Sequence, residues 1–353
     1  MIRVLGLALY GPMAASHRVR LGQYVPGLAR AGVRLRIQSL MTDRYLRYRF
    51  GGGSLPLRDM LGAGVRRLAD LAGSADHDLA IVYGELFPLM PGRAETLLLR
   101  RPYIYDFDDA FYLKYRTGRL AHLGPVLGCK FDRVIERAAA VTAGNEILAA
   151  YARRLNPHTL VFPTVVDTER YCAGRRRMDD VFTVGWIGSP STGPYLAELV
   201  APLARVGSLG RLRLVVCGAA APRIPNVETI EVPWSEATEV AVIQGFDVGV
   251  MPLPDDDWSR GKCAYKLVQY MACGVPVVAS AIGANVDVVA PECGYLVRGA
   301  DEWVATLQHL RHHAELRSSM GAAGAARVAA RYSLKATLPV LTDLIGRIAA
   351  QSA

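Results

Sequence analysis

The sequence lacks the patterns that mark several classes of protein. It contains six cysteines in 353 residues, and none of them forms a Cys-x-x-Cys pair or lies in a cluster with histidines. We therefore expect reduced thiols, with no metal site and no disulfide framework. No apolar run is long enough to span a membrane, and no internal repeat of solenoid length is visible.

In the first half of the chain, acidic residues are too few to balance the basic residues. Residues 1–170 hold 24 Lys and Arg against 15 Asp and Glu, whereas residues 171–353 hold 17 of each. A one-sided basic field suggests an anionic partner such as a phosphate, a nucleic acid or an acidic membrane surface. An Arg-rich composition without functional meaning is the alternative. Because no nucleic-acid-reading motif is present, we expect no nucleic acid partner.

Short apolar runs alternate with helical stretches along the whole chain. This alternation predicts an α/β protein with parallel sheets that are covered on both faces. Strands are expected at 2–9, 33–39, 79–83, 103–107, 139–143, 159–162, 181–187, 212–217, 227–232, 247–252, 276–280 and 294–297. Helices are expected at 17–31, 57–72, 120–138, 145–155, 191–206, 236–244, 262–273, 301–313 and 315–331.

A polar segment, "CAGRRRMDD" at 172–180, interrupts this alternation before a fresh strand begins. We place a domain junction near 165–180 and expect two doubly wound, Rossmann-like domains, 1–170 and 171–332, followed by a C-terminal helix in 333–353. Ligands of such sheets bind at the carboxyl ends of the strands, so the cleft between the domains is the natural site. The opening "IRVLGLALYGP" is typical of a first strand rather than a signal peptide, and we expect a cytoplasmic protein.

Two segments are candidates for binding a phosphate. "VGWIGSPSTG" (184–193) is a strand followed by a glycine turn, in which Gly188 permits close approach. Ser189, Ser191 and Thr192 are expected to cap the next helix or to donate to a phosphate. Glycine that serves only the geometry of the turn is the alternative.

The second segment, "RGKCAYKLVQYMACGVPVVAS" (260–280), places cations near a predicted helix N-terminus, where they oppose the helix dipole unless an anion lies between them. At 100° per residue, Lys262, Lys266 and Gln269 share one polar stripe of this helix, and Arg260 precedes it. We expect the stripe to face a phosphate; a solvated stripe is the alternative.

Taken together, "YMACGVPVVAS", "GANVDVV", "CGYLV" and "VFPTVVDTERY" resemble the retaining GT-B glycosyltransferases of family 4, mostly over residues 140–345. The resemblance implies a nucleotide-sugar donor bound mainly by the C-terminal domain, an acceptor bound mainly by the N-terminal domain, and no metal or other cofactor. It also implies that the final helix crosses back to the N-terminal domain.

The family motif E-x7-E is not kept, because its glutamates fall on Gly261 and Gln269. Gln269 can still bind a ribose diol, and we expect Arg260, Lys262 and Lys266 to neutralise the donor diphosphate. In the family, the loop that matches "VPWSE" (232–236) contacts the nucleobase, so Trp234 is expected to border the base. A tryptophan packed at a domain edge is the alternative.

In the first half, Ser16 is expected to cap a helix, and Arg18 and Arg20 to reach a phosphate of the donor or acceptor. Asp106 and Asp108 end another strand and are catalytic candidates that would hold acceptor hydroxyls; pairing with Arg18 and Arg20 is the alternative. Arg and apolar residues interleave in 44–53 and 55–71, which suggests peripheral contact with an anionic membrane, although a packed amphipathic helix has the same pattern.

These features together favour a retaining glycosyltransferase that acts in the synthesis of a cell-surface glycan, a glycolipid or a secondary metabolite. The acceptor is expected to be a glycan, a lipid-linked sugar or a small molecule. A catalytically reduced GT-B protein that binds a sugar nucleotide or glycan without transfer is the alternative, because both family glutamates are missing.

Overall fold

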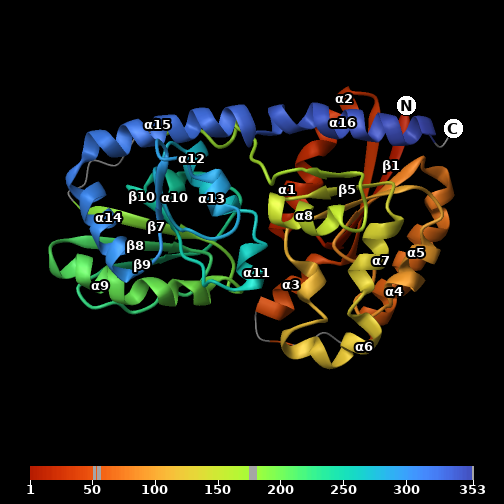
Figure 1. Cartoon of the computed structure of the whole chain (residues 1–353), viewed down its shortest axis with the longest axis horizontal. Coiled ribbons are helices and arrows are strands. Elements are labelled where there is room, and N and C mark those ends of the chain that lie inside the picture. Colours follow the sequence, from red (N-terminus) through yellow and green to blue (C-terminus); the bar gives the residue numbers. More distant parts are fainter. Residues whose placement is uncertain (51–52, 54–56, 175–180, 352–353) are drawn as a thin grey trace. The chain divides into compact units, whose positions relative to one another are not determined.

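The computed structural model describes residues 1–50, 53, 57–174 and 181–351. Residues 175–180 of the predicted domain junction, and residues 51–52 and 55–56 of the interleaved segments 44–53 and 55–71, lie outside the described residues. The chain divides into two compact units, Met1–Thr164 with Thr337–Ala353, and Val165–Ala336. Each unit is built on its own sheet with helices packed against it (Figure 1).

The first unit contains a six-stranded parallel sheet of order β2-β1-β3-β4-β5-β6. β1 lies between β2 and β3, so the strand order reverses there and the carboxyl ends of β1 and β3 border a natural ligand position. β3 and β4 are buried along their whole length, as expected for strands covered on both faces. The strands are β1 (Ile2–Tyr10), β2 (Val33–Met41), β3 (Leu79–Tyr83), β4 (Tyr103–Phe107), β5 (Ala140–Ala143) and β6 (Thr159–Val161).

Two of the four helices predicted for this unit are divided into shorter pieces, whereas the helix predicted at 57–72 has these bounds in the structure. The expected helix at 17–31 is split into α1 (Ala15–Arg20), the 3-10 turn η1 (Gly22–Tyr24) and α2 (Val25–Arg30), because Pro26 can only begin a new helix. The expected helix at 120–138 is likewise divided. The remaining helices are α3 (Asp43–Phe50), α4 (Leu57–Ala72), η2 (Gly73–Asp76), α5 (Gly92–Leu98), η3 (Phe111–Leu113), η4 (Gly118–Leu123), α6 (Gly124–Leu127), α7 (Lys130–Arg137) and α8 (Glu146–Arg153).

The last helix, α16 (Leu334–Gln351), contributes most of its length to the first unit. The Tyr24 hydroxyl lies 2.9 Å from Thr337 Oγ1. Gly27 on α2 approaches so closely that a Cβ there would lie 2.4 Å from the Leu338 side chain. The fold of the first unit therefore includes the end of the chain, which packs on α2.

The second unit contains a six-stranded parallel sheet of order β12-β11-β10-β7-β8-β9. Alternating residues of its strands enter two apolar clusters, one with α9 and α14 and the other with α12 and α15. The order reverses at β7, which lies between β10 and β8. The strands are β7 (Phe182–Ile187), β8 (Leu212–Cys217), β9 (Glu228–Val232), β10 (Val248–Met251), β11 (Val277–Ser280) and β12 (Gly294–Val297).

Three predicted helices of the second unit begin later than expected, among them the helix at 236–244, which begins at Glu239. The chain after β7 forms the 3-10 segment η5 (Gly193–Leu199), with Pro194 in its first turn, before α9 (Val200–Ser208) begins. The expected helix at 262–273 begins only at α12 (Tyr265–Ala272) and is preceded by α11 (Asp257–Arg260). The others are α10 (Glu239–Gln244), α13 (Asn285–Val288), α14 (Ala300–His312) and α15 (Ala314–Arg331).

Candidate functional site

Three loops meet at the carboxyl edge of the second sheet, after β7, β8 and β9. A Cβ on Gly188 would lie 2.4 Å from the Trp186 indole and 2.8 Å from Thr192 Oγ1. Gly218 has φ +89°, and a Cβ on it would lie 2.3 Å from the Gly188 carbonyl oxygen and 3.0 Å from Trp234 Cβ. Both glycines are thus required sterically, and they hold the glycine turn beside Trp234.

The hydroxyl groups of the glycine turn bond to one another and to the turn itself. Ser189 Oγ lies 2.7 Å from Ser191 Oγ, and Thr192 Oγ1 donates to the Ser189 carbonyl oxygen at 3.1 Å. Thr192 occupies the position before η5, yet no side chain caps that segment. The prediction that these residues cap a helix is therefore wrong, and the turn is stabilised by its own hydrogen bonds.

Arg260 does not oppose a helix dipole, contrary to the prediction. It lies in the last turn of α11, where a cation is favourable, and it pairs with Asp255 at 2.8 Å and Asp257 at 3.4 Å. Gly261 is the C-cap of this short helix and is buried. Ala264, with φ +53°, then turns the chain into α12. The Arg260 charge is thus balanced within its own loop.

Lys262 and Lys266 are half-buried, and their ammonium groups lie over aromatic rings. Lys262 Nζ is 5.9 Å from the Tyr195 ring centroid and 5.8 Å from that of Trp258. Lys266 Nζ is 5.3 Å from the Trp186 centroid. The same Trp186 indole contacts Gly188, so the structure brings the predicted cation and the predicted glycine turn to one side chain. A ring holds a cation in place without cancelling its charge.

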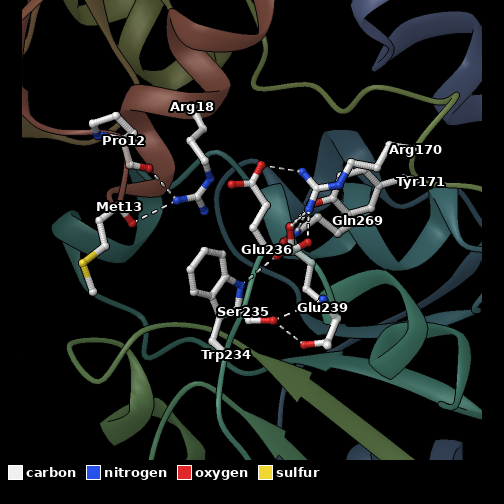
Figure 2. A network of polar contacts seen from close by, with 11 residues as sticks. Pro12, Met13, Arg18, Arg170, Tyr171, Trp234, Ser235, Glu236, Glu239 and Gln269 are labelled. Atoms are coloured by element: carbon white, nitrogen blue, oxygen red, sulfur yellow. Dashed lines mark hydrogen bonds and ion pairs between the residues drawn. The ribbon is translucent and has the colours of Figure 1, made fainter. Parts of the chain in front are cut away.

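The helical projection placed Gln269 on an exposed polar stripe, but in the structure Gln269 is only 4% exposed. Its Nε2 donates to the Tyr171 hydroxyl at 3.1 Å, and Tyr171 donates to Glu239 Oε1 at 2.6 Å. Glu239 also accepts from Arg170 at 2.6 Å and from Trp234 Nε1 at 2.8 Å (Figure 2). Burial raises the pKa of Tyr171 well above its usual value, which keeps the phenol protonated as a donor.

Sequence reasoning missed Arg170, Tyr171 and Glu239. The segment "VFPTVVDTERY" carries part of the family resemblance, but nothing in it indicates that its last two residues meet a glutamate almost 70 positions later. In contrast, Trp234 was predicted as a site residue, and the structure places it beside the glycine turn. Its indole N–H is turned toward Glu239 (Figure 2).

The loop after β1 positions two of the candidates in the first unit. Arg18 donates to the carbonyl oxygens of Pro12 and Met13, each at 2.9 Å (Figure 2). Ser16 is the second residue of α1, whose N-cap is Ala14, so Ser16 does not cap the helix as predicted. Arg18 is thus anchored to the loop by two backbone carbonyls, at the carboxyl end of the strand where the sheet order reverses.

Arg20 and Asp106 form a buried ion pair and not a ligand-binding pair. Both residues are 3% exposed; Arg20 Nε donates to Asp106 Oδ2 at 2.9 Å, and its Nη2 donates to Oδ1. Arg20 also donates to the Phe162 carbonyl oxygen and to Thr164, and Thr142 donates to Asp106. The pairing alternative describes both residues, since their charges and hydrogen-bonding groups are satisfied within the protein.

Asp108, by contrast, is half-buried and accepts a hydrogen bond from the Tyr83 hydroxyl. Burial, with a further contribution from Asp109, raises its pKa to about 6. A separate buried cluster surrounds Glu85, two residues after Tyr83. Glu85 accepts hydrogen bonds from Lys114, Tyr115 and Lys130, and Lys130 also contacts Glu95 at 3.0 Å. The sequence analysis did not identify this buried cluster, because its members are dispersed along the chain.

Among the residues that the structure describes, no group of three or more His, Cys, Asp and Glu side chains is arranged to hold a metal ion. In the same residues, no helix is both long and apolar enough to cross a membrane.

Comparison with known proteins agrees with this geometry. Residues 180–313 match the family described as glycosyl transferases group 1. A D-inositol 3-phosphate glycosyltransferase of Stackebrandtia nassauensis is 32% identical over 235 residues, which are 57% of this chain. The match spans only 51%, about half, of that relative's length.

Solved structures share the architecture over nearly the whole chain. A sucrose-phosphate synthase from Thermosynechococcus elongatus superposes with a TM-score of 0.73 at 15% identity, covering 99% of this chain and all of the other. The Anabaena protein HepE, solved in complex with UDP, gives a TM-score of 0.66 at 13% identity, covering 98% and 100%. The chain therefore has the GT-B fold, and its residues 180–313 are similar to the glycosyl transferases group 1 family.

Proposed function

We propose that the protein is a glycosyltransferase that moves a sugar from a nucleotide-sugar donor to an acceptor with retention of anomeric configuration. The observation that carries this proposal is the meeting of Lys266, Trp186 and Gly188 at the carboxyl edge of the group 1 domain, with Trp234 beside them. The Anabaena protein of the same fold was solved with UDP and with UDP-glucose, which supports a donor of this class.

The proposed chemistry requires stabilisation of negative charge. The bond between the sugar and the diphosphate breaks, a bond to the acceptor oxygen forms on the same face, and the acceptor's proton passes to the leaving phosphate oxygen. Negative charge accumulates on the diphosphate in the transition state, and a cation already in place lowers that barrier. We assign this role to Lys266 and Lys262, and we invoke no resident cofactor.

The alternative is a protein that binds a sugar nucleotide without transfer. One observation favours it: Gly261 has no side chain, and Gln269 is turned inward to Tyr171, so neither supplies the function of the family glutamates. Assays of donor hydrolysis and of sugar transfer separate the two, because only the enzyme releases a nucleoside diphosphate.

A thermal-shift screen tests binding of a sugar nucleotide, which the transferase and the binding-only alternative both require. UDP-, GDP-, ADP- and dTDP-sugars are added to the protein, and the one that binds raises the midpoint of unfolding by mass action. Stabilisation by one of the four is the expected result. No stabilisation at millimolar concentration by any of them would contradict the proposed donor class.

We further propose that the acceptor is lipid-linked and that the first unit rests on an anionic membrane. The support is α4, on which Met60, Leu61, Val65 and Leu68 are 44%, 64%, 67% and 47% exposed. The exposed Arg58 and Arg66 flank this apolar stripe. Apolar side chains bordered by arginines suit an interface with acidic headgroups, and the location would then be peripheral at the inner face of the cell membrane.

A further inference from the structure

Glu239 is a buried carboxylate on which three hydrogen-bond donors converge. Its side chain is 3% exposed. Oε1 accepts from Arg170 Nη2 and the Tyr171 hydroxyl, both at 2.6 Å, and Oε2 accepts from Trp234 Nε1 at 2.8 Å (Figure 2). Arg170 also ion-pairs with Glu236 at 2.9 Å. A carboxylate suits this position because it only accepts, and every neighbour donates.

The three donors come from separate parts of the unit. Arg170 and Tyr171 precede β7, whereas Trp234 follows β9 and packs against Gly218, which in turn contacts the glycine turn. Tyr171 accepts from Gln269 on α12. Glu239 therefore links the Trp234 loop to the helix that carries Lys266, across the ligand edge of the sheet.

This arrangement also determines what Trp234 offers to a ligand. An indole has one hydrogen-bond donor, and here that donor is directed to Glu239. The half-buried ring then presents an apolar surface beside the glycine turn, and such a surface stacks on a nucleobase rather than hydrogen bonding to it.

We propose that Glu239 is a positioning residue for the nucleobase: it fixes the orientation of Trp234 and so sets the affinity for the base without touching the ligand. The inference rests on the proposed nucleotide-sugar function. It does not concern the diphosphate, which we assign to Lys262 and Lys266.

The test is Glu239→Gln, measured with five probes: UDP, GDP, ADP, dTDP and inorganic pyrophosphate, which has no base. The amide has the size of the carboxylate but turns an NH2 donor toward one of the three donors. We expect affinity for the nucleoside diphosphate that binds the wild type to fall about tenfold or more, with the affinity for pyrophosphate unchanged. An equal loss for both probes, or no loss for either, would overturn the proposal.

Trp234→Phe supplies the matched background. Phenylalanine has no N–H, so in this background the amide introduced at position 239 no longer meets a third donor, and Glu239→Gln should weaken nucleotide binding much less than in the wild type. If Glu239→Gln and Trp234→Phe lower the nucleotide affinity additively, Glu239 acts only through general stability. That result would overturn its role toward Trp234. Wild-type protein that binds no nucleoside diphosphate would instead overturn the proposed function, and this role with it.

Discussion

Lys266 lies over Trp186, a side chain that is 1% exposed and borders the glycine turn. At the residue scale, this contact leads to a prediction for Lys266→Ala. Loss of a cation that stabilises the leaving diphosphate should lower kcat/KM about 100-fold. The free energy of unfolding should fall by only about 1 kcal/mol, the cation–π contribution. Steady-state kinetics and urea denaturation measure both.

The control is Lys335→Ala, which removes an exposed lysine on α16. It should leave kcat/KM and stability unchanged within error. Wild-type kinetics in Lys266→Ala would show that the diphosphate is neutralised elsewhere.

Gln269 occupies the position of a family glutamate, and the Tyr171 hydroxyl explains why a carboxylate does not fit there. Tyr171 has one proton and gives it to Glu239, so the partner at 269 must donate. Gln269→Glu should therefore lower the free energy of unfolding by about 2 kcal/mol at pH 8, because a buried carboxylate loses its partner. The loss should shrink toward pH 4, where the new carboxyl is protonated and donates. Gln351→Glu, at an exposed position, should show neither effect.

The raised pKa of Asp108 leads us to expect that the stability of the protein depends on pH. Its pKa is raised to about 6 in the folded protein, against about 3.9 in an unfolded chain. Its contribution to stability is thus fully present below about pH 4 and lost as pH rises through about 6. Asp108→Asn keeps an acceptor for Tyr83 and removes the charge, so it should stabilise the protein by at least about 1 kcal/mol at pH 8 and not at pH 4.

Denaturation in urea at several pH values measures this difference. Asp343→Asn is the control, since its side chain is 66% exposed and its pairing with Arg347 adds little. Equal stability of Asp108→Asn and wild type across this range would contradict the raised pKa.

At the same scale, the sequence predicted residues whose role is local and missed those that depend on distant partners. Gly188 was identified because a glycine turn after a strand is a local signal. Arg20 and Asp106 were proposed for ligands, yet they pair with each other across 86 positions. Glu239 was not considered, since nothing in "VPWSEATE" shows that Tyr171 approaches it.

At the scale of elements, the strands were predictable and several helix starts were not. Each predicted strand is found within two residues of its expected bounds. Strands such as β3 and β10 are buried along their whole length and read as continuous apolar runs in the sequence. The segment before α12 was misjudged because Ala264 adopts a left-handed conformation, φ +53°, that no propensity indicates. As a result, Lys262 lies outside the helix and the predicted polar stripe does not exist.

The loops at the ligand edge give a prediction for Gly218→Ala. The backbone at φ +89° is strained for any other residue, and the new Cβ would meet the Gly188 carbonyl oxygen at 2.3 Å. We expect a loss of about 2–3 kcal/mol in the free energy of unfolding and weaker nucleotide binding, since the glycine turn must move. Gly346→Ala on α16 meets nothing within 4 Å and should be neutral or stabilising by up to about 1 kcal/mol.

At the scale of the whole molecule, the prediction of a GT-B fold is confirmed, and residues 180–313 match the model of the glycosyl transferases group 1 family. Motifs of the second half carried that prediction. The first half has few recognisable motifs, so its interpretation rested mainly on composition. Its arginines include the buried Arg20 and Arg67 as well as exposed residues on several elements, and composition alone cannot separate these.

The exposed stripe of α4 leads to a prediction about membrane binding. The double variant Leu61→Ser, Val65→Ser should reduce co-sedimentation with vesicles of phosphatidylglycerol about tenfold or more, because two exposed apolar side chains no longer enter the interface. Wild-type binding should weaken with salt and be much lower on phosphatidylcholine, which carries no net charge.

Leu97→Ser provides the matched control, since Leu97 is 83% exposed but lies on α5, outside the stripe. It should bind vesicles as the wild type does, and all variants should keep the same affinity for the donor nucleotide, because α4 and α5 lie in the first unit. Equal sedimentation of the double variant and the wild type would contradict a membrane role for α4. The exposed leucines and valine would then require another partner, and the basic half of the chain another anion.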